Sequence, residues 1–149
     1  MSRTAAGVTI IATDGPAGRS GATVSSFSSL SLAPPSIVVC FQRDSVTLAL
    51  LRANGVFCAN VLAENQADIA RVFARSSDRE TRFSHGRWTK AASGAPKLAG
   101  ALCRLDCRLA GATDYGSHVI VIGEALESRS SPGRPLIYSA RNFHPLGEF

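Results

Sequence analysis

The apolar residues of this chain occur in short runs rich in Val, Ile and Thr. Gly, Pro, Asp and Ser residues interrupt these runs, as is typical of β-strands joined by turns. Seven segments fit a strand, namely residues 7–13, 21–27, 36–42, 56–62, 101–109, 117–123 and 134–138. None of the runs approaches the roughly 20 apolar residues that a membrane-spanning helix needs. The pattern therefore predicts a mainly β protein that does not enter a membrane.

Two segments have helical features. Residues 45–54 begin with Ser45, a favoured N-cap residue, and stop before Gly55, a residue type favoured just beyond a helix end. Residues 63–74 carry apolar side chains at helical spacing, with acidic residues on the other side. The following stretch, residues 75–98, contains Gly and Pro signals and predicts a long loop.

Two helices among seven strands favour a barrel-like β fold over a parallel sheet with crossover helices. The sequence contains no repeat, charge block or linker that would divide it. A chain of 149 residues can bury roughly 70% of its unfolded surface in one core. We therefore expect a single domain over residues 1–149.

The net charge of +5 arises from 16 Lys and Arg residues against 11 Asp and Glu residues, and most of the cations are Arg. Such an excess suits nucleic acid, an acidic protein partner or an anionic small ligand. The Arg residues are scattered along the chain, however, and the few aromatic residues lie mostly in apolar runs. A nucleic-acid surface needs both kinds of residue on one face, so we expect no nucleic-acid binding.

Four cysteines occur in strand-like surroundings. Cys40 and Cys58 lie in apolar runs, and Cys103 and Cys107 alternate with charged residues so that both face one side of a strand. The three histidines are scattered, whereas a zinc site needs ligands at close spacing. The first residues lead into a strand without the long apolar region of an export signal. We expect free structural thiols, no metal site and a cytoplasmic protein.

A stretch rich in Ser and Thr, residues 23–31, is polar for a strand and leads to the rigid pair Pro34-Pro35. Hydroxyls and backbone N–H groups beside small side chains suit a polar, planar ligand that lies along the strand. An edge strand with a hydrated serine face explains the same composition. The composition leaves both interpretations open.

Two strand-to-helix junctions and one turn carry further candidate residues. Arg43 and Ser45 precede a helix whose N-terminal N–H groups favour an anion such as phosphate. Asn60 interrupts an apolar run, so its amide needs hydrogen-bond partners. His118 follows a turn at Gly116 and opens an apolar strand, where it can reach a cleft. The alternatives are a simple helix cap, backbone partners for the amide and a surface histidine.

The order and spacing of these pieces resemble the flavin reductase-like family, whose members have an FMN-binding split β-barrel of Greek-key topology with a few short helices. The resemblance runs from Gly7 to about Phe143. Its carriers are residues 7–13, 21–31 with Pro34-Pro35, 57–63 with Gln66, 73–74, 96–100, 116–118, 122–124 and 135–138.

The resemblance implies an NAD(P)H-dependent flavin reductase, which transfers a hydride from NADH or NADPH to FMN, with FAD as an alternative flavin. It also implies a homodimer that supplies reduced flavin to a partner monooxygenase. Because the family contains members that bind flavin for other purposes, the alternative function is an FMN-binding electron-transfer module without nicotinamide turnover.

The resemblance further implies roles for individual residues. The flavin contacts are Thr23, Val24, Ser25 and Ser26 at the ring and ribityl chain; Arg43 and Ser45, with the backbone of Cys40, Phe41 and Gln42, at the phosphate; Asn60, Leu62 and Ala63 at the ring edge; and Phe83 and Phe143 as aromatic covers. His118 is the catalytic residue near the nicotinamide. The family commonly has Gly-Asp-His where this chain has Gly116-Ser117-His118. Serine cannot supply the negative charge that would support a protonated histidine.

Overall fold

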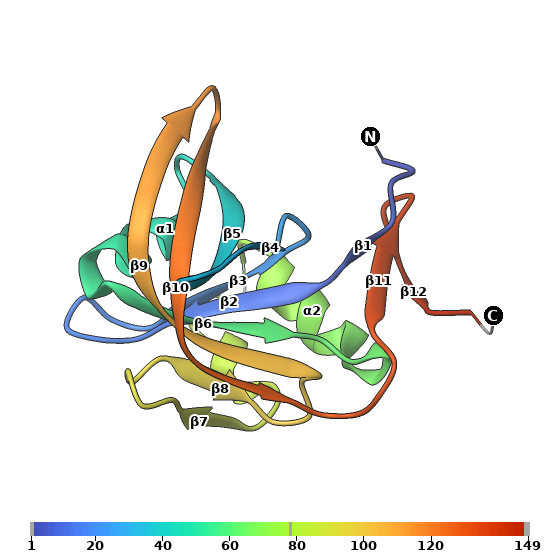
Figure 1. Cartoon of the computed structure of the whole chain (residues 1–149). Coiled ribbons are helices and arrows are strands. Elements are labelled where there is room, and N and C mark those ends of the chain that lie inside the picture. The colour runs from blue at the N-terminus through green and yellow to red at the C-terminus, as the bar shows by residue number, and fades with distance from the viewer. Residues whose placement is uncertain (1, 78, 148–149) are drawn as a thin grey trace.

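The computed structural model describes residues 2–77 and 79–147, and a seven-stranded antiparallel sheet dominates it (Figure 1). In spatial order its strands are β3 (Ser20–Val24), β2 (Thr9–Thr13), β6 (Val56–Val61), β9 (Cys103–Tyr115), β10 (His118–Ser130), β5 (Pro35–Gln42) and β4 (Ser28–Leu32). A second sheet contains β1 (Ala6–Gly7), β11 (Leu136–Ser139) and β12 (Asn142–Pro145). A separate hairpin pairs β7 (Trp88–Lys90) with β8 (Pro96–Leu98).

The helices are short and follow β5 and β6. The two α-helices are α1 (Val46–Asn54) and α2 (Ala67–Ala74), and the two 3₁₀ turns are η1 (Glu64–Gln66) and η2 (Arg82–Ser84). The Oγ atom of Ser45 accepts the Leu48 N–H at 3.2 Å, as expected of an N-cap residue. Gly55 ends α1 with a φ of 74°, in the left-handed region that favours glycine. Both predicted helix boundaries of α1 are thereby confirmed.

The large sheet curls until its two ends meet. Ser26, just beyond β3, exchanges two hydrogen bonds with the backbone of Cys40 on β5, donating to its carbonyl at 2.9 Å and accepting from its N–H at 3.1 Å. These contacts join β3, at one end of the strand order, to β5, which lies beside the strand at the other end, β4. The mainly β, barrel-like fold expected from the sequence is confirmed.

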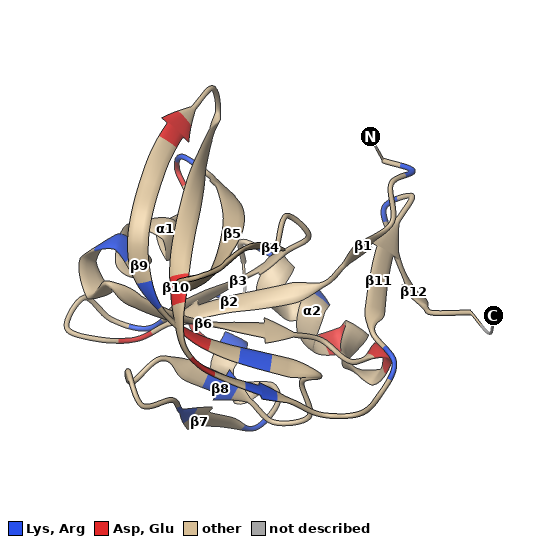
Figure 2. Ribbon diagram, viewed as in Figure 1, with Lys and Arg blue, Asp and Glu red and all other residues tan. Residues whose placement is uncertain are grey.

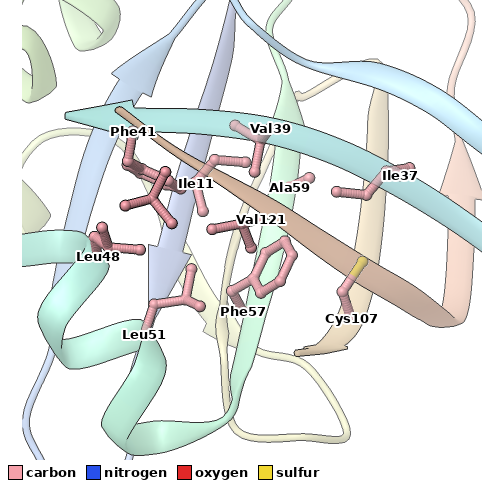
Figure 3. Close-up of a cluster of buried hydrophobic side chains, with 11 residues drawn as sticks. Ile11, Ile37, Val39, Phe41, Leu48, Leu51, Phe57, Ala59, Cys107 and Val121 are labelled. Atoms are coloured by element: carbon pink, nitrogen blue, oxygen red, sulfur yellow. The ribbon is translucent and has the colours of Figure 1, made fainter. Parts of the chain in front are cut away.

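Two apolar clusters cover the two faces of the curled sheet. The cluster inside the curl includes Ile11, Phe57 and Val121, together with Leu48 and Leu51 of α1 (Figure 3). The second cluster lies between the outer face, α2 and the β7–β8 hairpin, and it contains Val8, Ile10, Ala12, Leu62, Ala70, Val72, Phe73, Leu98, Ala101 and Leu136. Because β2 contributes to both clusters, all five of its residues are buried. This explains why its central residues, Ile10, Ile11 and Ala12, are apolar in succession rather than alternating with polar ones.

Several predicted boundaries were wrong. β9 and β10 extend to Tyr115 and Ser130 and form a long hairpin that projects from the barrel (Figure 1). The end of β9 (residues 112–115) and the end of β10 (residues 126–130) are exposed on both faces, so no apolar alternation marks them in the sequence. The predicted loop over residues 75–98 contains η2, β7 and β8. The serine-rich stretch holds a separate edge strand, β4, which has mostly exposed side chains.

Candidate functional site

A hollow of about 460 Å³ opens where β3, β5 and the start of β10 meet α1 and α2. Most of its lining was expected from the sequence: Thr23, Val24, Ser25, Ser26, Cys40, Phe41, Gln42, Ser45 and His118, to which Ala22 and Ala74 are added. Its volume lies in the range of small-molecule sites. Three smaller hollows share lining residues with it. Together the four form a continuous groove, which we call the central groove.

One end of the central groove lies against the N-terminus of α1. This part, about 290 Å³, is lined by Ser45 and Thr47 and also by Arg79 and Arg82. The helix N-terminus and the two guanidinium groups all favour an anion. Arg82 is buried and donates to the carbonyl oxygens of Gly21, at 2.6 Å, and Arg75.

The two arginines come from residues 75–98, for which the sequence predicts a loop. Arg79 and Arg82 were missed because no secondary-structure pattern placed them near α1. The concentration of arginine between residues 71 and 82 was the one available signal.

A second end of the groove has an aromatic wall. This part, about 240 Å³, is lined by Val24 and Ser25 on one side and by Tyr138 and Phe143 on the other. The centres of the two aromatic rings are 5.3 Å apart, and the guanidinium carbon of Arg71 lies 5.3 Å from the centre of the Phe143 ring. Phe143 thus lines the groove as expected. Tyr138 belongs to residues 135–138, which carry part of the family resemblance, but the resemblance implies no role for it.

His118 lies at a third end, in a hollow of about 340 Å³ that it shares with Arg43 and Ser117. Its Nδ1 atom lies 2.8 Å from the Ser117 hydroxyl, so this serine fixes the orientation of the ring. Arg43 forms an exposed ion pair with Asp114 at 3.6 Å, instead of lining the hollow at the start of α1. The structure therefore groups Arg43 with His118 and groups Arg79 with Ser45.

The hydroxyl groups along the groove have different tasks. The Thr23 hydroxyl donates to the Ala70 carbonyl at 2.7 Å and so ties β3 to α2. The Ser26 hydroxyl holds β5, as described above. Ser25 makes no side-chain hydrogen bond to any residue in 2–77 or 79–147, so its hydroxyl is available to a ligand.

Four of the expected flavin contacts do not line the groove. Asn60 is fully buried; its Nδ2 atom lies within 3.3 Å of the Ile10, Cys58 and Pro96 carbonyls, and its Oδ1 accepts the Leu98 N–H at 2.8 Å. Leu62 is also fully buried in the outer cluster, and the Ala63 N–H donates to Gln66 at 3.0 Å.

Phe83 packs instead in an aromatic group with Phe73 and Trp88, beneath the Arg19 guanidinium. Gly21 leaves room for this group, because a Cβ atom there would lie 2.8 Å from the Phe73 ring. We therefore leave these four residues out of the proposed site. The sequence could not distinguish a buried amide satisfied by its own backbone from one that faces a ligand.

All four cysteines are free thiols. Burial, together with the negative charge of Asp106, raises the pKa of Cys58 and of Cys107 to about 12. Thiols with such pKa values stay protonated and unreactive at neutral pH. Across residues 2–77 and 79–147, no group of three or more His, Cys, Asp or Glu side chains could hold a metal ion.

Comparison with known proteins identifies the family. A family model described as "Flavin reductase like domain" matches residues 1–147. The chain belongs to the flavin reductase-like family. The resemblance inferred from the ordered motifs is thereby confirmed.

Similar members of the flavin reductase-like family have described activities. The protein named FMN reductase (NADH) RutF from Ancylobacter novellus is 38% identical over 147 residues, which cover 98% of this chain and 81% of that protein. BorF, the flavin reductase component of a bacterial two-component tryptophan halogenase, is 33% identical, with a TM-score of 0.91 over 99% of this chain and 94% of BorF.

A third similar protein has been solved with ligands. Streptomyces globisporus C-1027 NADH:FAD oxidoreductase SgcE6, in complex with NAD and FAD fragments, is 32% identical. Its TM-score is 0.91, and the match covers 98% of this chain and 88% of SgcE6. The chains of the flavin reductase-like family therefore share this fold nearly from end to end.

Proposed function

We propose that this chain is an NAD(P)H-dependent flavin reductase, which transfers a hydride from NADH or NADPH to FMN, with FAD as an alternative flavin. The observation that carries the proposal is the meeting of an anion-favouring helix end, an available serine hydroxyl and His118 in one groove. The activities named for similar proteins support it.

The residues of the central groove fit FMN. Ser45 and Arg79, at the N-terminus of α1, would hold the phosphate. The strand end from Thr23 to Ser26 would lie along the ring and ribityl chain, and Phe143 would cover an apolar part of the ring. Bound flavin supplies a ring nitrogen, N5, that accepts hydride.

The contribution of this chain is binding and alignment. His118 stands at the open third end of the groove, where it would orient the nicotinamide against the flavin ring. The Ser117 hydroxyl holds the His118 ring in place through Nδ1, which leaves Nε2 directed to other partners. The side chain of Arg43, 52% exposed, would attract the phosphates of the dinucleotide.

Our proposal includes a partner monooxygenase that receives the reduced flavin. It also includes a homodimer. Leu30 and Leu32 on the edge strand β4 are 52% and 94% exposed, and Leu126 on β10 is 54% exposed. Exposed leucines along an unpaired edge favour association with a second copy. Sedimentation velocity of the wild type and Leu32→Glu tests this: we expect a dimer and a weakened dimer, respectively, and a monomeric wild type would contradict it.

Our proposal also places the protein in the cytoplasm, and the four free thiols support a reducing compartment. Within residues 2–77 and 79–147, no helix combines the length and apolar character needed to cross a membrane.

Steady-state oxidation of NADH and of NADPH, with FMN in excess, tests the proposed reaction. We expect a rate well above that of the mixture without protein, with at least one of the two nicotinamides. Protein that binds FMN but leaves both nicotinamides unoxidised would contradict the proposal and favour the electron-transfer module.

A further inference from the structure

A second hollow, separate from the central groove, is bordered by the β7–β8 hairpin and by β6, β9 and β10. It has a volume of about 260 Å³ and is lined by Cys58, Ala91, Lys97, Arg104, Asp106, Glu127 and Arg129. Lys and Arg positions gather in this part of the molecule, below β6 in Figure 2. The hollow shares no residue with the central groove. Along β10, roughly 36 Å of extended strand separates His118 from Arg129.

The strand register explains why charged side chains converge here. Cys58, Asp106 and Glu127 lie opposite one another across β6, β9 and β10. Arg104 and Arg129 form the next row on the same face, two residues along each strand. Lys97 reaches the hollow from β8 on the hairpin that covers this face.

The charged side chains of this hollow differ in whether they have hydrogen-bond partners within the protein. Asp106 is buried, and its two carboxylate oxygens accept from the Ser93 N–H at 3.0 Å and the Ser93 hydroxyl at 2.5 Å. Glu127 accepts from the Arg129 guanidinium at 3.2 Å. Both carboxylates therefore already have donors.

The side chains of Lys97 and Arg104 make no hydrogen bond or ion pair to any residue in 2–77 or 79–147. The Nε atom of Arg104 is itself buried without an acceptor among those residues. Buried donors of this kind are rare, and a charged one is costly to leave unpaired. The two cations also lie close to Cys58: burial raises the pKa of that thiol, while Lys97 and Arg104 act in the opposite direction.

We propose that this hollow binds a phosphate group, either as inorganic phosphate or as the monoester of a small metabolite. The guanidinium of Arg104 presents a planar fork that matches phosphate oxygens, and the ammonium of Lys97 adds a second positive charge. Three cations and two carboxylates line the hollow, so its net charge is positive and favours an anion. Asp106 and Glu127 are held by their own donors, so neither takes Lys97 or Arg104 from the ligand.

The site is independent of flavin reduction, and its test uses the full chain without FMN, because FMN is itself a phosphomonoester. The Arg104 side chain reports on this hollow alone, since it does not line the central groove. Inorganic phosphate is titrated at constant ionic strength while the Arg104 Nε–H resonance is followed by ¹H–¹⁵N NMR. Arg104→Lys assigns that resonance by removing it. We expect a saturable shift of the Arg104 signal, whereas a shift that stays linear in phosphate would overturn the proposal.

Charge-matched variants locate the binding. Lys97→Gln and Arg104→Gln should each weaken phosphate binding by about tenfold, the loss of one charge-assisted contact. Arg108→Gln removes the same charge from β9 at an exposed position that pairs with Glu124 outside the hollow, and it should bind phosphate normally. Equal weakening in all three variants would mean a general charge effect and would overturn the proposal. If Arg104→Gln fails to fold, Lys97→Gln and the wild-type titration decide.

A second titration with AMP distinguishes the two sources of the phosphate group. Tighter saturable binding of AMP than of phosphate at the Arg104 signal would assign a phosphomonoester. Equal or weaker binding of AMP would assign free phosphate. Failure of both probes to saturate the signal would refute the site, whatever the flavin reductase assay shows.

Discussion

His118 on β10 lies directly opposite Gln42 on β5 in the register of the two strands. Gln42 is the last residue of β5 and leads within three residues to Ser45, the N-cap of α1. The Arg43 N–H also donates to the Ser117 carbonyl at 3.1 Å. Strand pairing thus connects the proposed nicotinamide end of the groove with the proposed phosphate end, although 76 positions of sequence separate the two residues.

The first prediction concerns His118. His118→Ala should lower kcat with NADH by about tenfold or more, because the nicotinamide loses a group that orients it. FMN affinity should change much less, since His118 lies at one end of the groove. Steady-state kinetics and flavin fluorescence titration measure the two effects. His85→Ala, an exposed histidine outside the groove, is the control. Lost FMN binding with unchanged turnover per bound flavin would refute the assignment.

The second prediction separates Arg79 from Arg43. Because Arg79 lies at the start of α1, Arg79→Ala should weaken FMN by about tenfold and riboflavin hardly at all. Arg43→Ala, which removes the cation beside His118, should raise the KM for NADH more than it weakens FMN. Titrations with FMN and with riboflavin measure the affinity of each variant for the two flavins. A selective loss of FMN in Arg43→Ala alone would return the phosphate to Arg43, as the family resemblance implied.

The third prediction tests the role of Asn60. Asn60→Ala should lower the free energy of unfolding by about 2–4 kcal/mol, since it leaves the buried Leu98 N–H and three carbonyls with fewer partners. Urea denaturation measures this. The folded fraction should bind FMN normally. Asn65→Ala, at an exposed position, should be neutral. A variant of normal stability with weakened FMN binding would instead make Asn60 a flavin contact.

The fourth prediction concerns the packing of Phe57 in the inner cluster. A Cβ atom on Gly123 would lie 2.3 Å from Phe57 Cζ, and Phe57 is fully buried. Gly123→Ala should therefore cost about 1–3 kcal/mol of stability. Gly111→Ala is the matched control on the paired strand, because its Cβ atom would meet only Ile122, at 4.0 Å. Thermal melts compare the two, and similar melting temperatures would argue against close packing at Phe57.

Local sequence patterns predicted much of the secondary structure, the family and most of the groove residues. Ser45 and Gly55 marked both ends of α1, because caps depend on residues a few positions apart. Apolar runs marked the buried strands, because burial follows from side-chain polarity. The ordered motifs gave the family and most of the residues around the central groove. They missed the ends of β9 and β10, residues 112–115 and 126–130, which are exposed on both faces.

Only the tertiary structure decided where polar residues point. Asn60 faces backbone partners, Arg43 lies beside His118, and Arg79 reaches the start of α1 from a segment predicted to be a loop. Arg104 and Lys97 meet at a second hollow through strand register and hairpin packing. These placements depend on pairing between residues far apart in the chain. A polar side chain carries no local mark of its distant partners, so the sequence fixes its chemistry while the fold decides what it contacts.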